Sequence, residues 1–87
     1  MLNDLEIKYK MSINENLLFE EIYKNEKYIR KQLHLLRVSI NYNYELIRIA
    51  IDIEKQMIII SRPYDCKSYE FTPSSTLIFE YFKLKYS

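Results

Sequence analysis

The sequence predicts a small α+β domain, an antiparallel meander packed against a long amphipathic helix and a short C-terminal helix, in the order β-α-β-β-β-α. Apolar and polar residues alternate in several short segments, which is typical of half-buried strands. Between and after them, two segments show helical spacing of apolar residues. The length of 87 residues, with 48% hydrophobic and 29% charged residues, indicates one globular domain spanning residues 1–87.

The first element is expected to be a strand at residues 5–11. The run Leu-Glu-Ile-Lys-Tyr-Lys-Met alternates without a fault, so its four apolar side chains share one face. These are Leu5, Ile7, Tyr9 and Met11.

A long helix is expected from about residue 14 to about residue 34. Asn14 suits the N-cap, and Glu15 places a carboxylate in the first turn, where it complements the helix dipole. At about 100° per residue, one stripe is formed by Leu18, Ile22, Asn25, Ile29, Leu33 and Leu36. The opposite side is basic and carries Lys27, Arg30, Lys31, His34 and Arg37. We therefore expect Ile22, Ile29 and Leu33 in the core and Lys27 in solvent.

Residues 35–44 fit two structures. Ile40 continues the helical stripe, whereas the apolar residues also alternate as in a strand. Without glycine, Asn41 and Asn43 are the first residues that tolerate a left-handed backbone. Either structure predicts a turn near residues 41–45.

Two further strands form a predicted hairpin. Isoleucines alternate with polar residues or alanine over 47–53, and an apolar run covers 57–60, with a turn at Glu54 and Lys55 between them. A second turn is predicted at 62–65, where Pro63 suits a type I turn, and a third strand follows through Tyr69 and Phe71.

The last element is expected to be a short helix. Thr72 suits an N-cap and Pro73 the first helical position. Helical spacing then follows at Leu77, Ile78, Tyr81, Phe82 and Lys85.

Composition excludes several classes of site. A chain with no glycine has no glycine-rich phosphate loop, dinucleotide fingerprint or nucleophile elbow. One cysteine and one histidine form neither an internal disulfide nor a four-ligand zinc site. We therefore expect no cofactor and no metal. The longest wholly apolar stretch is 57–60 and no signal segment is recognisable, so a cytoplasmic protein that does not enter the membrane is expected.

No residue pattern indicates catalysis, and we expect a protein that is not an enzyme. Cys66 would need His34 nearby to become a nucleophile, and nothing in the sequence brings the two together. The carboxylates are scattered along the chain, and a paired-carboxylate hydrolase also needs desolvated acids. A small cysteine or carboxylate enzyme is the third hypothesis.

Two features indicate a binding surface. The basic residues Lys27, Arg30, Lys31, His34 and Arg37, with Tyr28 beside them, resemble a phosphate-tracking face, although the net charge is only +1. Nine tyrosines exceed what so small a core can bury, and tyrosine is favoured at protein interfaces. The candidate partner-binding residues are Lys27, Tyr28, Arg30, Lys31, His34, Arg37, Tyr42, Tyr44 and Tyr64.

The leading hypothesis is a non-catalytic protein-binding module, a small inhibitor or adaptor of a host or phage protein. Residues with AT-rich codons dominate, which favours a phage or mobile element of an AT-rich bacterium. In size and composition the chain is similar to small phage anti-defence proteins such as anti-CRISPRs, although no motif carries this likeness. The alternative is a nucleic-acid-binding regulator that uses the basic helix face. The sequence leaves a homo-oligomer open.

Overall fold

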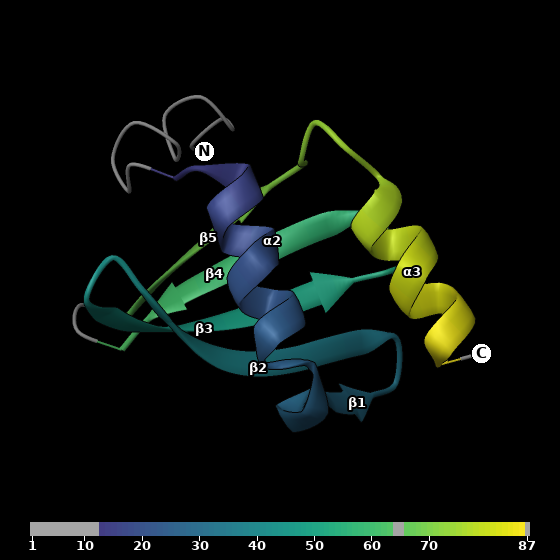
Figure 1. The fold of residues 1–87 in the computed structure, drawn as a ribbon, viewed down its shortest axis with the longest axis horizontal. Helices are drawn as coiled ribbons and strands as arrows, with labels where there is room; N and C mark the ends of the chain where they lie inside the picture. Colours follow the sequence, from purple (N-terminus) through teal and green to yellow (C-terminus); the bar gives the residue numbers. More distant parts are fainter. Residues whose placement is uncertain (1–12, 64–65, 87) are drawn as a thin grey trace.

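The computed structural model describes residues 13–63 and 66–86. Five antiparallel strands form one sheet in the order β1-β2-β3-β4-β5, so each strand pairs with its neighbour in sequence (Figure 1). The strands are β1 (Arg30–Gln32), β2 (Leu35–Tyr42), β3 (Glu45–Asp52), β4 (Met57–Arg62) and β5 (Lys67–Phe71). The helical elements are α2 (Glu15–Lys24), the 3-10 turn η1 (Glu26–Tyr28) and α3 (Leu77–Lys85). The predicted meander and the order of its elements are confirmed, whereas the predicted strand at 5–11 lies outside the described residues.

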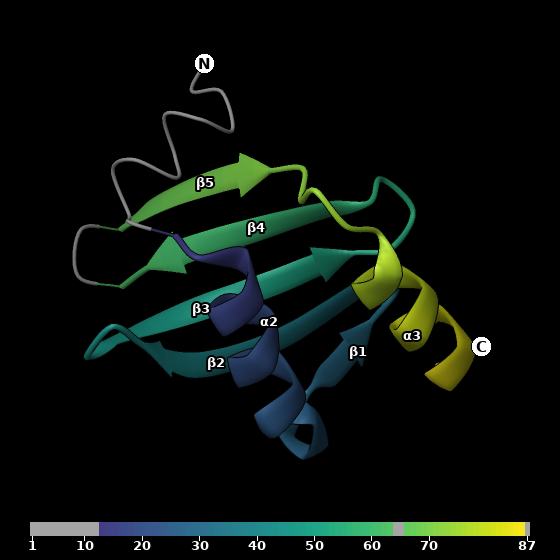
Figure 2. The same cartoon turned by 45° about the horizontal axis from the view of Figure 1, so that its top comes forward.

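The core lies between the sheet and the two α-helices, which share one side of the sheet (Figures 1 and 2). Leu18 and Ile22 of α2 are fully buried, and Phe82 of α3 joins the same cluster. From the strands the buried set includes Leu36, Val38, Ile40, Ile47, Ile49, Ile51, Ile58, Ile60 and Phe71. Because strand side chains alternate between faces, every second residue of β2, β3 and β4 faces this core.

Residues 35–42 form strand β2 and residues 43–44 form a turn, which resolves the ambiguity of the sequence. β2 and β3 are joined by the two-residue turn Asn43-Tyr44, with φ of 53° and 62°, and Tyr42 pairs with Glu45. Two successive positive φ angles are typical of a type I′ turn, whose twist matches that of the flanking strands. The predicted turn at 41–45 is confirmed.

The predicted length of the first helix, from about residue 14 to about residue 34, is wrong, because α2 covers only Glu15–Lys24. α2 begins after Asn14, whose side-chain Oδ1 accepts a hydrogen bond from the Leu17 backbone N–H (3.2 Å), as expected of an N-cap. It ends at Lys24, because the Asn25 side chain donates a hydrogen bond to the Glu21 carbonyl (2.8 Å) and thereby caps the last turn. Asn25, the polar residue in the predicted apolar stripe, is thus the residue at which the helix ends.

The chain reverses at Leu33, between β1 and β2. Leu33 has φ of 58° and is 83% exposed, so its expected place in the core is wrong. The chain therefore adopts a left-handed backbone at a leucine, before it reaches Asn41 and Asn43, where the sequence predicts the first such residue. Ile29 is partly buried and packs against the core from the segment between η1 and β1.

The C-terminal helix begins four residues later than the motif at Thr72 and Pro73 predicts. Its N-cap is Thr76, whose side chain makes no capping hydrogen bond. The preceding segment is instead tied to the start of α2, since the Ser74 backbone N–H and hydroxyl both donate to the Glu15 carboxylate (2.7 and 3.0 Å). This contact holds the chain in a non-helical path until residue 76.

Candidate functional site

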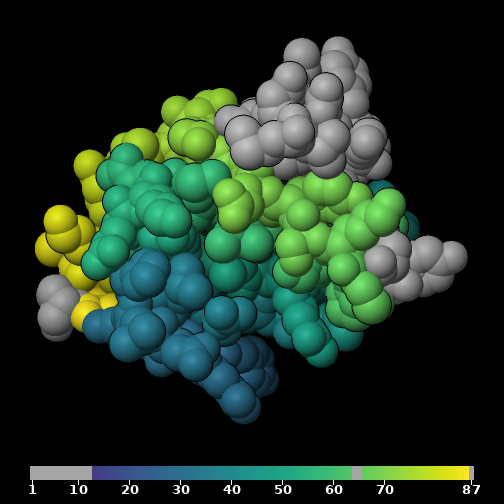
Figure 3. Space-filling model, turned by 180° about the vertical axis from the view of Figure 1, so that it is seen from behind, coloured from purple at the N-terminus to yellow at the C-terminus, as the bar shows by residue number. Residues whose placement is uncertain are grey.

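The sheet face opposite the helices is not covered by either described helix (Figures 2 and 3). The residues whose alternation places them on it form rows across the strands. The first row is Gln32, Leu35, Asp52 and Met57; the second is Arg30, Arg37, Ala50, Ile59 and Glu70; the third is Ser39, Arg48, Ser61 and Ser68; the fourth is Asn41 and Leu46. On this face, strand register therefore brings together side chains that are far apart in the sequence.

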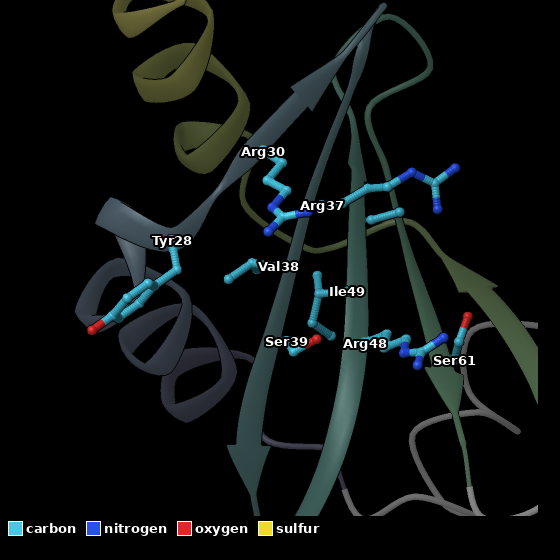
Figure 4. Close-up of a pocket in the computed structure, with 9 residues that line it drawn as sticks. Tyr28, Arg30, Arg37, Val38, Ser39, Arg48, Ile49 and Ser61 are labelled. Atoms are coloured by element: carbon cyan, nitrogen blue, oxygen red, sulfur yellow. The ribbon is translucent and has the colours of Figure 1, made fainter.

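Three of the four arginines of the chain lie together on this face. Arg30 is directly opposite Arg37 across β1 and β2. Arg37 is opposite Ala50, so Arg48, two residues earlier on β3, is its diagonal neighbour. The three side chains are exposed and line a shallow hollow of about 630 Å³, with Tyr28 at its edge. Figure 4 shows the Arg37 and Arg48 side chains running in the same direction, towards β4.

No carboxylate of the described residues forms an ion pair with Arg30, Arg37 or Arg48. The fourth arginine provides the contrast, because Arg62 Nε and Nη2 donate to the two carboxylate oxygens of Glu45 at 2.9 and 3.2 Å. Among the described residues, one arginine is thus held in a bidentate pair, whereas the other three lie side by side without an ion pair.

An aliphatic strip borders these arginines. Ala50 on β3 pairs with Ile59 on β4, while Leu35 and Met57 occupy the adjacent row on either side of Asp52. Leu35, Met57 and Ile59 are partly exposed. We call the set Arg30, Arg37, Arg48, Leu35, Ala50, Met57 and Ile59 the arginine face.

The predicted basic helix face does not exist, because its residues lie on η1, β1, β2 and a turn. Arg30 and Arg37 remain neighbours, through strand pairing and not helical spacing. Lys31 points to the helix side, where its Nζ donates to the Tyr86 carbonyl (2.9 Å). Lys27 Nζ lies 5.1 Å from the centre of the Tyr28 ring. The structure therefore divides the predicted cluster.

Arg48 was missed, although the sequence carries a signal for it. A two-residue turn at Asn43-Tyr44 fixes the register of the hairpin, and counting back from it pairs Arg48 with Ser39. Alternation of Ile47 and Ile49 with Arg48 already places the arginine on the polar face.

His34 has a partner that its own segment does not reveal. Its Nε2 lies 3.6 Å from Asp52 Oδ2, and the Asp52 side chain is only 6% exposed. Asp52 Oδ1 also accepts the Lys55 backbone N–H (3.0 Å), so this carboxylate organises the turn between β3 and β4. Cys66 is exposed, and its thiol lies 3.8 Å from the Pro63 carbonyl oxygen.

The candidate tyrosines have different surroundings. Tyr28 is 63% exposed beside the hollow, and Tyr44 is fully exposed at the tip of the β2–β3 turn. Tyr42 is structural, because its hydroxyl accepts the Asn14 backbone N–H (2.7 Å). Tyr64 lies outside the described residues.

A polar contact fastens α3 to η1. Tyr81 Oη donates to Glu26 Oε1 (2.6 Å), and Lys85 Nζ donates to the same oxygen. The hydrogen bonds from Lys85 and Tyr81, Lys85 first, hold the pKa of Glu26 below its ordinary value of 4.5. The Glu26 carboxylate in turn raises the pKa values of Lys85 and Tyr81 through the same hydrogen bonds. Burial, together with the nearby Glu26, raises the pKa of Tyr23, whose ring packs edge-on against Tyr81.

Within residues 13–63 and 66–86, no group of three or more His, Cys, Asp and Glu side chains is arranged to hold a metal ion. The described helices include none with the length and apolar character needed to cross a membrane. No protein-family model matches the chain, and neither a curated protein nor a solved structure matches it.

Proposed function

We propose that this chain is a non-catalytic protein-binding module that docks its partner on the arginine face. One observation carries the proposal: three arginines without a carboxylate partner among the described residues adjoin a partly exposed aliphatic strip, on a sheet face that neither described helix covers. Surfaces that combine arginine with partly exposed apolar side chains are suited to a protein interface.

The composition of the face supports a protein partner over a nucleic acid. Protein interfaces are enriched in arginine and depleted in lysine, and every cation that lines the hollow is an arginine. Sheet surfaces that bind single strands stack bases on aromatic rings. Here the positions between the arginines carry Ala50 and Ser39, and Tyr28 at the edge is the one aromatic residue that lines the hollow.

An inhibitor or adaptor of a host protein, of the anti-defence type encoded by a phage or mobile element, is the specific form that we propose. An inhibitor of this kind acts by occupying a surface, which requires no catalytic group. The exposed arginines and aliphatic residues supply such a contact surface.

A nucleic-acid-binding regulator is the second candidate, and the same arginines favour it. Phosphate contacts by Arg30, Arg37 and Arg48 would give a log-log salt slope of about −3 on duplex DNA. The two candidates therefore share a surface and differ in the ligand.

The test compares capture of partners from host lysate with and without nuclease, using the whole chain as bait. The bait variants are the substitution of Arg30, Arg37 and Arg48 by Gln and a control that changes Lys24, Lys55 and Lys83 to Gln. Both variants alter the net charge by the same amount, and the control lysines lie off the arginine face.

We expect a protein that is retained after nuclease treatment by the wild type and by the lysine control, and lost by the arginine variant. Capture that nuclease abolishes would instead support the regulator. Retention by the arginine variant would contradict docking on this face.

A further inference from the structure

The arginine face holds like charges at the separations where they repel. Directly opposite residues on antiparallel strands have Cβ atoms about 5 Å apart, and diagonal neighbours are about 7 to 8 Å apart. Arg30 lies directly opposite Arg37, and Arg48 is the diagonal neighbour of Arg37. Asp52 is also diagonal to Arg37, but its two carboxylate oxygens lie against His34 Nε2 and the Lys55 backbone N–H. Because no described carboxylate forms an ion pair with the three arginines, their guanidinium groups are offered to an external anion.

We propose that the arginine face binds an acidic, extended segment of the partner protein, with carboxylates on Arg37 and Arg48 and an aliphatic side chain on the neighbouring strip. This inference rests on the proposed function and adds the chemistry of the partner. Guanidinium groups pair with carboxylates through two parallel hydrogen bonds, and the Arg62–Glu45 pair shows that geometry within this chain.

The spacing on the face matches an extended chain. Side chains two residues apart on a strand point the same way and lie about 6.6 Å from each other. Carboxylates at positions i and i+2 of such a segment therefore reach the diagonal pair Arg37 and Arg48 together. Leu35 lies two residues from Arg37 along β2, so an aliphatic side chain at i+4 reaches the strip there.

The aliphatic strip distinguishes this ligand from a phosphodiester chain. Leu35, Met57 and Ile59 are partly exposed next to the arginines, and covering them removes apolar surface from water. A sugar-phosphate backbone supplies anions but no aliphatic side chain. A segment that alternates acidic and aliphatic contacts uses both parts of the face.

The binding test uses a fluorescein-labelled peptide of about 12 residues, Ser-Glu-Ser-Glu-Ser-Leu repeated, whose alternate residues point to one side. We expect a Kd of roughly 100 μM at physiological salt for so short a probe. Replacing Glu by Gln should weaken binding at least tenfold, and replacing Leu by Ser at least threefold. Equal binding by all three peptides would overturn the proposal.

Arginine Nε–Hε resonances in NMR spectra of the whole chain give a residue-level readout. Titration with the unlabelled peptide should shift the signals of Arg37 and Arg48, and Arg30 more weakly. Arg62 is the internal control, because Glu45 already holds its guanidinium, and its signal should stay in place. Shifts confined to Arg62, or none at all, would overturn the inference.

The outcomes separate the inference from the proposed function. If the peptide leaves the arginine signals unchanged while lysate capture of a protein still requires Arg30, Arg37 and Arg48, the protein-binding function stands and the acidic segment is wrong. If single-stranded DNA binds below 1 μM and shifts the same signals, both are wrong.

Discussion

At the residue scale, the sequence reveals those features whose cause is local. The cap at Asn14 depends on a side chain and a backbone N–H three residues away, and it was predicted. The left-handed Leu33 was not, because a leucine in this conformation is disfavoured by about 1 to 2 kcal/mol. Only the pairing of β1 with β2, which the sequence does not show, makes the chain reverse there.

The backbone at Leu33 provides the first prediction. Leu33→Asn should raise the free energy of unfolding by about 0.5 to 1 kcal/mol, because asparagine accepts a positive φ more readily and the leucine side chain is exposed. Leu33→Val should lower it by about 1 kcal/mol, since a β-branched residue fits this conformation worst. The measurement is urea denaturation of both variants; a stabilising valine would show that the reversal is not left-handed.

A second prediction contrasts two apolar residues of the predicted helical stripe. Ile22 is fully buried, so Ile22→Ala should cost about 2 to 4 kcal/mol. Leu33→Ala should change stability by less than about 0.5 kcal/mol, because the side chain is exposed. Thermal unfolding measures both, and similar losses at the two positions would contradict the placement of Leu33 in solvent.

At the element scale, a strand could be predicted when it was long enough for the alternation of apolar and polar residues to show. β3 and β4 have eight and six residues and show their alternation, so these strands and the turn between them follow from the sequence. β2 has eight residues as well, but its apolar residues also continue the helical stripe, so the sequence left it open between helix and strand. β1 has three residues, all exposed, which is too short for any period to appear. Helical spacing therefore seemed to continue through Asn25 into residues that belong to η1 and the sheet.

The contact between η1 and α3 makes a prediction about pH. Because the pKa of Glu26 is lowered in the folded chain, its ionised form stabilises the fold above pH 4.5, and this contribution is lost as pH falls through the lowered pKa. Glu26→Gln should therefore melt at a lower temperature than the wild type at pH 7, and the gap should close towards pH 3.

Thermal melts at pH 7, 5 and 3 check this, with Glu80→Gln as the control. Glu80 is an exposed carboxylate on α3 for which no ion pair is found within the described residues. A gap that stays constant over this range would mean that Glu26 carries no pH-dependent stabilisation.

At the scale of the whole molecule, the arginine face is a product of register. Arg30 and Arg37 were singled out from the sequence for the wrong reason, as members of a helix face, and Arg48 was not singled out at all. The three come from strands that lie side by side, so their proximity requires the pairings β1–β2 and β2–β3 to be known together. A helix brings together residues three or four apart, whereas a sheet brings together residues that the chain separates.

The last prediction follows from the repulsion within this face. Substituting Arg30, Arg37 and Arg48 by Gln should raise the melting temperature by about 2 to 8 °C at low salt. Removing two like-charge contacts is worth about 0.5 to 1 kcal/mol, and 1 kcal/mol corresponds to roughly 4 to 8 °C in a domain of this size.

Salt provides the internal check on this prediction. The Debye length falls from about 30 Å at 0.01 M to about 8 Å at 0.15 M, so added sodium chloride screens the arginines and should stabilise the wild type more than the variant. The control that changes Lys24, Lys55 and Lys83 should not gain stability, because Lys24 already lies within ion-pair distance of Glu20 and Glu21. A rise in stability after loss of the three arginines is expected of charges that are kept for binding. A lower melting temperature of the arginine variant would instead show that these side chains stabilise the fold.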